Sequence, residues 1–226
     1  MDGTGRPDDR RPFPPPASGD RGPVARPRPT ERRPARPTAE DRSSRSGLEP
    51  ASSRTLESPI GTLLLVATAV GLVRLGLPTE DHDGVLTDLV GRTGLALDQA
   101  PRLLDPAARA LDAYFTGRSR TVDLPVDLRL LRGFRREVAR SLTTIAYGTT
   151  RSYAAVAARL GHPKAARAVG TACASNPVPL VLPCHRVVRA DGTVGGYRGG
   201  AELKAALLAF EAGGGRPELL TGHPRT

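Results

Sequence analysis

The 226 residues carry a formal net charge of +10, almost all of it from arginine, and 38% of them are hydrophobic. This length suffices for one or two domains, and the positive charge favours a polyanionic partner such as DNA, although a GC-rich genome also produces arginine-rich chains. Only two cysteines are present, Cys173 and Cys184, which disfavours a disulfide framework and a structural zinc site.

Membrane insertion and export are not indicated by the composition. No apolar run reaches the ~18 residues that a membrane-spanning helix needs. The N-terminal residues lack the apolar region of a signal peptide, since Arg, Pro and Asp interrupt them throughout. We therefore expect a cytoplasmic protein with no membrane partner, in a reducing environment that keeps cysteine thiols usable.

The two ends of the chain differ from its middle. Residues 1–50 hold 11 of the 22 prolines and 11 arginines, with few aliphatic side chains and no periodic pattern. Such a composition is typical of disordered segments. We predict a disordered Pro/Arg-rich tail over residues 1–50, ordered structure from about Arg54, and a second disordered tail over residues 214–226.

Residues 54–125 are predicted to form a small N-terminal domain of mixed helices and strands. Two short apolar runs around a glycine-containing turn are typical of a β-hairpin, and an Asp-Pro pair is typical of a helix start. In chain order, the expected elements are a hairpin of residues 62–68 and 72–77, a short helix over 84–92, a helix capped by Asp105 that runs to about Phe115 and stops at Gly117, and a strand over 121–124.

A helical pattern dominates residues 126–213. Apolar residues recur at helical spacing from Leu130 to Ile145. Two short helices follow, one capped by Ser152 and one over residues 164–174, with a tight Gly/Pro turn between them. This arrangement is typical of a helix-turn-helix motif.

The second helix of this motif consists mostly of small residues, with Lys164 and Arg167 as its long side chains. A helix that reads bases in the major groove is expected to carry several Asn, Gln or Arg side chains. Small residues instead allow close approach to a shallow groove, with Arg167 as a wedge and Lys164 near a phosphate. An ordinary alanine-rich core helix explains the same segment, so both interpretations stay open at this point.

The segment that indicates chemistry is residues 176–188, an apolar, strand-like run that leads into Cys184 and His185. A free thiol has a pKa of about 8.5, so a neighbouring base is needed to make it a nucleophile. Adjacent residues of an extended chain face opposite sides, so we expect a water to bridge Cys184 and His185. Glu211, after the predicted apolar helix 201–210, is the candidate carboxylate that fixes the imidazole tautomer. A cysteine that only packs in the core is the alternative.

An ordered set of motifs resembles the O6-alkylguanine-DNA alkyltransferase family (methylated-DNA–[protein]-cysteine S-methyltransferases). The resemblance spans residues 55–213 and is dense over 145–211. The motifs are, in order, Tyr147–Tyr153 (YGTTRSY), Pro163–Gly170 (PKAARAVG), Asn176–Pro177, Pro183–Val187 (PCHRV), Gly195–Gly200 (GGYRGG) and Leu207–Glu211 (LLAFE).

The resemblance implies a role for each matching position. Cys184 is the alkyl acceptor, and His185, acting through water, and Glu211 complete the relay that generates the thiolate. Asn176 braces the active-site turn by hydrogen bonds to the backbone. Tyr153 touches the flipped base and donates a proton to the leaving guanine.

The same resemblance implies which residues meet the DNA. Arg167 fills the gap that the extruded nucleotide leaves, and Tyr197 and Arg198 lie in a loop that closes one wall of the base pocket. The family often has a histidine directly before the glutamate, where this chain has Phe210. The expected DNA-binding residues are Thr150, Arg151, Lys164, Ala165 and Arg167, and the expected pocket residues are Tyr197, Arg198, Val187 and Cys173.

We therefore expect an α+β protein, with a small N-terminal α/β domain and a helical, winged-helix-like DNA-binding domain that carries the active-site cysteine. The expected function is direct-reversal DNA repair. An alkyl group moves irreversibly from O6-alkylguanine, and possibly also from O4-alkylthymine, in duplex DNA to Cys184. Since the thioether product has no good leaving group, each molecule acts once. We expect a monomer without cofactor or metal.

Three other functions stay open on the sequence alone. A lesion-recognition relative that does not transfer the alkyl group would lack the acceptor cysteine, whereas Cys184 is present. A cysteine hydrolase would turn over a small molecule without DNA, and the helix carrying Arg167 disfavours it. A transcriptional regulator would use the helix-turn-helix together with a dimerisation element, and the sequence shows none.

Overall fold

The computed structural model describes residues 48–98, 101–217 and 220. Most of the two predicted tails lies outside these residues. At the N-terminal side, β1 begins at Pro50, four residues before the expected start of order at Arg54. At the C-terminal side, Gly215 N donates a hydrogen bond to Phe210 O, and the Leu220 side chain is buried. No helix within these ranges is long and apolar enough to cross a membrane.

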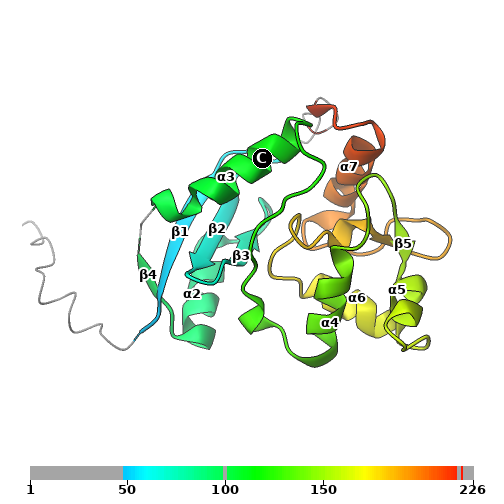
Figure 1. The fold of residues 1–226 in the computed structure, drawn as a ribbon, viewed down its shortest axis with the longest axis horizontal. Coiled ribbons are helices and arrows are strands. Elements are labelled where there is room, and N and C mark those ends of the chain that lie inside the picture. The colour runs from blue at the N-terminus through cyan, green and yellow to red at the C-terminus, as the bar shows by residue number, and fades with distance from the viewer. Residues whose placement is uncertain (1–47, 99–100, 218–219, 221–226) are drawn as a thin grey trace, which may run out of the picture. The chain divides into compact units, whose positions relative to one another are not determined.

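A four-stranded sheet in the order β3–β2–β1–β4 forms the first half of the structure (Figure 1). The predicted hairpin is confirmed, and it corresponds to the antiparallel pair β2–β3. β1 was not predicted, because its polar sequence shows no apolar periodicity, yet it pairs with β2 from Ala51 to Leu56. The strands are β1 (Pro50–Leu56), β2 (Leu63–Thr68), β3 (Leu72–Gly76) and β4 (Ala96–Asp98).

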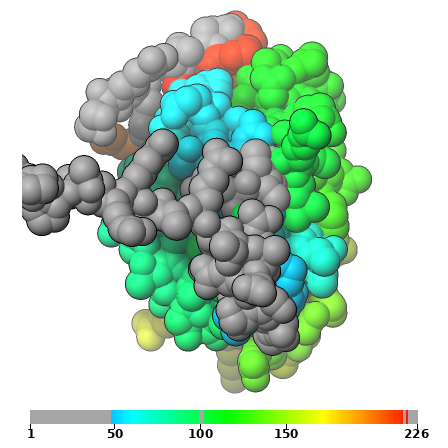
Figure 2. Space-filling model, turned by 90° about the vertical axis from the view of Figure 1, so that its left-hand side faces the viewer, coloured from blue at the N-terminus to red at the C-terminus, as the bar shows by residue number. Residues whose placement is uncertain are grey.

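One helix covers each face of the sheet. Leu63 and Leu65 of β2 belong to the core that includes α3 (Asp105–Phe115), whereas Leu64 and Val66 pack with Leu89 of α2 (His82–Thr93). Because successive side chains of a strand point to opposite faces, a strand between two helices is buried on both sides. This explains the continuous apolar run of β2 and confirms the helix expected near residues 84–92. The face shown in Figure 2 is formed mainly by these N-terminal strands and helices.

Two local predictions in this half are wrong. Asp105 is the first residue of α3 rather than its cap, and its carboxylate accepts a hydrogen bond from Arg54 Nη1 at 2.7 Å. Residues 121–124 form no strand. The chain meets the edge of the sheet just after them, where Val126 makes an isolated bridge with Leu72. Gly117 adopts a φ of 70° after the end of α3, as expected for a glycine stop.

The second half is helical, apart from a two-stranded parallel sheet. The predicted helix-turn-helix is confirmed by α5 and α6, which pack against each other. Ser152 Oγ accepts a hydrogen bond from Ala155 N at 3.1 Å, as expected for a cap. The elements are α4 (Gly133–Leu142), β5 (Arg151–Ser152), α5 (Tyr153–Arg159), α6 (Ala166–Ala174), β6 (Val187–Val188) and α7 (Gly200–Ala212), with the 3-10 helices η1 (Pro101–Leu104), η2 (Leu128–Leu130) and η3 (Cys184–Arg186).

The sheet is attached to the helical half through the edge strand β3. Leu75 N donates a hydrogen bond to Pro177 O at 2.8 Å, and Arg74 Nη1 donates to the same oxygen at 3.1 Å. The first of these bonds satisfies a backbone N–H group that an edge strand otherwise leaves unpaired. Both bonds also connect the N-terminal half directly to the turn that precedes Cys184.

Candidate active site

A tight turn carries the chain from α6 to Cys184. The strand-like run predicted here is wrong, because the three prolines between Pro177 and Pro183 cannot donate to a strand ladder. Asn176 braces the turn instead: its Nδ2 donates to Leu182 O at 2.7 Å, and its Oδ1 accepts from Val178 N at 3.1 Å. Leu180 has a φ of 71°, a conformation that costs a non-glycine residue about 1–3 kcal/mol.

The Cys184 thiol lies at the start of η3, in contact with the same asparagine. Asn176 Nδ2 donates to Cys184 Sγ at 3.1 Å, and Cys184 is only 3% exposed. Burial raises the pKa of the Cys184 thiol, while the Asn176 hydrogen bond and the positive charge of Lys204 act in the opposite direction. The resting side chain is therefore a neutral thiol, and a base has to remove its proton before it can act as a nucleophile.

Glu211 of α7 lies at the centre of a buried hydrogen-bond network. Burial raises its pKa, but hydrogen bonds from His185 and Arg186 outweigh this effect and hold the pKa of Glu211 at about 2. Arg186 approaches the carboxylate through both Nε and Nη2 at 2.9 Å. Tyr114 Oη and Gly148 N donate to it at 2.8 and 3.1 Å. Glu211 is thus an ionised carboxylate whose position is fixed from four residues.

His185 connects this carboxylate to the region of the thiol. Its Nε2 lies 2.9 Å from Glu211 Oε1, and since an ionised carboxylate only accepts hydrogen bonds, Nε2 carries the proton. Burial lowers the pKa of His185, so the imidazole is neutral and Nδ1 has a free lone pair. Nδ1 is buried and makes no hydrogen bond to any described residue. No hydrogen bond joins Cys184 to His185 within those residues, although η3 is not the extended chain that the prediction assumed.

Lys204 of α7 is a polar residue of the site that the sequence reasoning missed. It is fully buried, and its Nζ donates to Val187 O at 2.6 Å and to Tyr153 Oη at 3.3 Å. Burial lowers the pKa of Lys204, and the two nearby thiols, Cys173 and Cys184, oppose this shift. A detectable signal existed, because Lys204 is one of only two lysines in an arginine-rich chain and lies within an apolar helix.

Tyr153, the first residue of α5, packs against the loop of residues 195–200. A Cβ atom at Gly195 would lie 2.4 Å from Tyr153 Oη, so only glycine fits this close approach. Burial raises the pKa of Tyr153. Because Lys204 donates to the phenol oxygen, the hydroxyl proton of Tyr153 is free to point toward another acceptor.

The other expected pocket residues lie around these groups. Val187 is fully buried, and its carbonyl holds Lys204. Cys173 is buried, and burial raises its thiol pKa far above the ordinary value. The phenol oxygen of Tyr197 is buried without a partner among the described residues. Phe210 packs edge-on against Tyr114, with ring centroids 5.5 Å apart, and thereby supports a donor to Glu211.

The expected DNA-binding residues lie around the helix-turn-helix. Thr150, Lys164 and Arg167 are exposed, and Arg151 and Ala165 are partly buried. Within residues 48–98, 101–217 and 220, their polar side chains make no hydrogen bond or ion pair, and they are therefore available to an external partner. α6 starts at Ala166 rather than at Lys164, so Lys164 and Ala165 belong to the turn before it.

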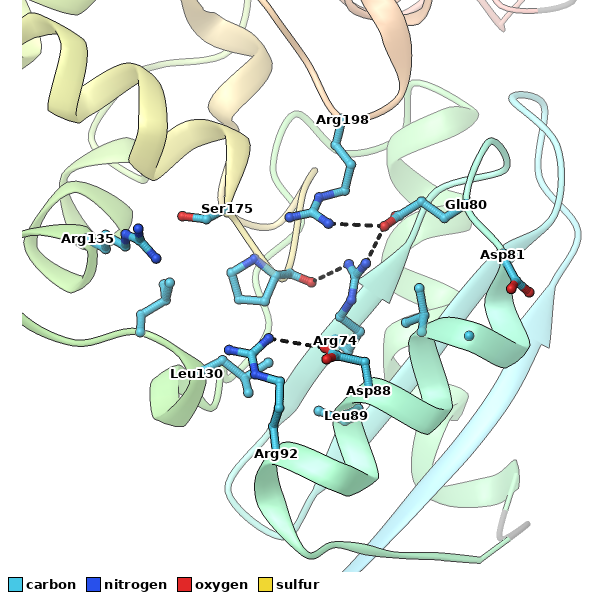
Figure 3. Close-up of a pocket in the computed structure, with 14 residues that line it drawn as sticks. Arg74, Glu80, Asp81, Asp88, Leu89, Arg92, Leu130, Arg135, Ser175 and Arg198 are labelled. Carbon is cyan, nitrogen blue, oxygen red and sulfur yellow. Dashed lines mark hydrogen bonds and ion pairs between the residues drawn. The ribbon is translucent and has the colours of Figure 1, made fainter.

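The loop of residues 195–200 also borders a cleft of about 470 Å³ between α2 and the helical half (Figure 3). Arg198 points into this cleft and meets Glu80, which also contacts Arg74. The part of the chain that the structure describes has no cluster of three His, Cys, Asp or Glu side chains able to hold a metal ion.

Comparison with known proteins gives consistent matches over the same residues. The family model described as 6-O-methylguanine DNA methyltransferase, ribonuclease-like domain, matches residues 53–128, and the DNA binding domain of the same family matches residues 133–213. A methylated-DNA–protein-cysteine methyltransferase of Mycolicibacterium paratuberculosis is 42% identical over 158 residues, which cover 70% of this chain and 90% of the relative.

Solved structures agree with these matches. The crystal structure of Mycobacterium tuberculosis OGT in complex with DNA has a TM-score of 0.62 and 36% identity, covering 76% of this chain and 98% of that chain. The crystal structure of the Mycobacterium tuberculosis O6-methylguanine methyltransferase has a TM-score of 0.60 and 38% identity, covering 72% and 93%. The chain therefore belongs to the 6-O-methylguanine DNA methyltransferase family.

Proposed function

We propose that this protein repairs alkylated DNA by direct reversal, as a methylated-DNA–[protein]-cysteine S-methyltransferase that uses each molecule once. The observation that carries the proposal is the buried Cys184 thiol, held by Asn176 and followed by a histidine that an ionised carboxylate orients. The names of the relatives, and the complex of one of them with DNA, support the same activity. The proposed lesion is O6-alkylguanine in duplex DNA.

Proton transfer begins at His185. Its Nε2–H group donates a hydrogen bond to Glu211. Nδ1 is therefore the atom that takes the Cys184 proton, through a bridging water. The imidazolium that forms is then stabilised by the adjacent carboxylate at 2.9 Å. The Asn176 amide already donates to Sγ and stabilises the negative charge that develops there.

The transfer is an in-line displacement at the alkyl carbon. A bond forms between Cys184 Sγ and that carbon while the bond from carbon to guanine O6 breaks, and the electron pair leaves with guanine. Tyr153 supplies the proton that neutralises the leaving base, because Lys204 occupies its oxygen as a donor and leaves the hydroxyl proton free. The thioether product has no good leaving group, so turnover is not expected.

The target carbon is hidden in the base stack, and the nucleotide has to be flipped out at a cost of a few kcal/mol. We propose that Arg167 fills the resulting gap and that Lys164, Thr150 and Arg151 contact phosphates. The small residues of α6 allow its backbone to approach the minor groove. Arg167 is exposed and carries no internal ion pair within the described residues, which suits this role.

We further propose that the protein acts as a cytoplasmic monomer, with domains over residues 54–125 and 126–213. The two family matches, which meet near the same boundary, support this division. Hydrogen bonds from Tyr114 to Glu211 and from Leu75 to Pro177 cross the boundary, so the N-terminal domain supports the site.

Methyl transfer from a tritiated O6-methylguanine duplex tests the proposal. Cys184→Ala should abolish transfer and leave the affinity for alkylated DNA within about threefold, whereas Cys173→Ala should retain transfer. Label on the Cys184→Ala protein would contradict the acceptor assignment. Repeated turnover of a small molecule without DNA would instead indicate a cysteine hydrolase.

A further inference from the structure

One carboxylate of the N-terminal half reaches the loop of residues 195–200 (Figure 3). Glu80 lies in the turn between β3 and α2. Its Oε1 accepts hydrogen bonds from Arg198 Nη1 at 3.2 Å and from Arg74 Nη2, and its Oε2 accepts from Leu77 N at 2.8 Å. The side chains of Glu80 and Arg74 are 11% and 8% exposed, so solvent screens this pair only weakly, whereas the side chain of Arg198 is 32% exposed.

The cationic partners of Glu80 continue to the active-site turn. Arg198 Nη2 donates to Ala174 O, at the end of α6, at 2.8 Å. Arg74 Nη1 donates to Pro177 O at 3.1 Å. Ala174 and Pro177 flank Asn176, whose amide contacts Cys184 Sγ. Through Arg198 and Arg74, Glu80 therefore connects both the loop of residues 195–200 and the turn before Cys184 to the N-terminal half.

The loop needs such a fixed point because of its composition. Four of the six residues in Gly195–Gly200 are glycine, which makes the segment conformationally free. Its other two residues are Tyr197, whose phenol oxygen is buried, and Arg198. The charge-assisted hydrogen bond from Arg198 to the largely buried Glu80 carboxylate is a directional restraint on such a segment.

We propose that Glu80 is a positioning residue for alkyl transfer: through Arg198 it holds the 195–200 loop closed as a wall of the base pocket. This inference rests on the proposed function. Glu80 touches neither the thiol nor the base. Its role is to keep the base pocket in its closed form before the substrate binds.

Transfer from the free base O6-benzylguanine reports the pocket alone, because it requires neither duplex binding nor flipping. Glu80→Gln keeps the shape of the side chain and removes its charge. The half-saturating concentration of O6-benzylguanine should rise about tenfold, with the limiting rate changed by less than about twofold. Each chain should still accept one benzyl group. A purely structural role would instead lower the melting temperature and the reactive fraction at an unchanged half-saturating concentration, and would overturn the proposal.

Asp88→Asn is the matched control. Asp88 lines the same cleft and pairs with Arg92 on the surface of α2, with its side chain 65% exposed. The substitution removes the same charge close to Glu80 and should leave the half-saturating concentration unchanged. A tenfold rise in this variant would mean that the charge of the cleft matters rather than the contact with Arg198, and would overturn the proposal.

A double-mutant cycle tests whether Glu80 acts through Arg198. Arg198→Gln should raise the half-saturating concentration as Glu80→Gln does, and the double variant should be no worse than Arg198→Gln alone. If the double variant instead raises the half-saturating concentration by the product of the two single-variant factors, the two residues act independently and the proposal is refuted. If Glu80→Gln fails to fold, Arg198→Gln alone still tests the proposal, because this variant leaves the Arg74–Glu80 pair intact. An unchanged half-saturating concentration of O6-benzylguanine for Arg198→Gln would then refute the proposal. Reaction of the unsubstituted protein is measured in parallel, so failure of the proposed function is recognised separately.

Discussion

Protonation of Glu211 should weaken the fold by an amount that its surroundings define. The pKa of Glu211 lies at about 2, against 4.5 for an unperturbed glutamate. At about 1.4 kcal/mol for each pKa unit, the ionised carboxylate contributes about 3 kcal/mol to the free energy of unfolding at neutral pH. Because the folded pKa is the lower one, this contribution is present above about pH 4.5 and is lost as the pH falls toward 2.

The Glu211→Gln variant isolates this contribution. The variant leaves the Arg186 guanidinium buried without its counter-ion, so it should lose about 3–5 kcal/mol at pH 7. Urea unfolding of both proteins between pH 7 and pH 2.5 should show their difference shrinking as the pH falls, since the wild-type advantage disappears. The Asp112→Asn variant is the control, because Asp112 pairs with Arg118 on the surface, with its side chain 62% exposed, and its effect should stay small at every pH. A stability difference between Glu211→Gln and the wild type that does not change with pH would show that ionisation of Glu211 does not stabilise the fold.

Three further predictions concern the site and the tail. Arg167→Ala should slow repair of duplex DNA at least tenfold more than reaction with O6-benzylguanine, and equal losses in the two rate assays would remove Arg167 from the flipping role. Gly195→Ala places a methyl group 2.4 Å from Tyr153 Oη. It should reduce the rate of methyl transfer at least tenfold with little change in melting temperature, and an unchanged rate would mean that Tyr153 can move without cost. Deletion of residues 1–47, which spares β1, should leave the transfer rate on a short oligonucleotide within about threefold, and complete loss would show that the tail takes part in the reaction.

Short sequence patterns predicted the elements that neighbouring residues alone determine. The hairpin of β2 and β3, the Ser152 cap and the glycine stop after α3 each depend on a few neighbouring residues, and all three were found. β1 was missed because its polar sequence is held by pairing with β2 and not by its own apolar pattern. The turn before Cys184 was taken for a strand because its apolar residues obscured the effect of three prolines.

The site could be predicted from motifs but not its supporting contacts. Cys184, His185 and Asn176 lie within nine residues of each other, so the motif brings them together. Lys204 and Tyr114 reach the site only through the packing of α7 and α3, which no short sequence pattern encodes. Long-range contacts of this kind need the fold, and they explain why residues 54–125 showed no chemistry in the sequence.

In the proposed reaction, Cys184 accepts one alkyl group from DNA and keeps it. The most direct test is to incubate the purified protein with an excess of duplex carrying O6-methylguanine and to record intact and peptide masses. A gain of about 14 Da, the mass of one methyl group replacing a proton, on the Cys184 peptide and saturating at one per chain is the predicted result. No mass gain with tight binding to the lesion would indicate a recognition protein. The absence of both mass gain and binding would contradict the proposed function.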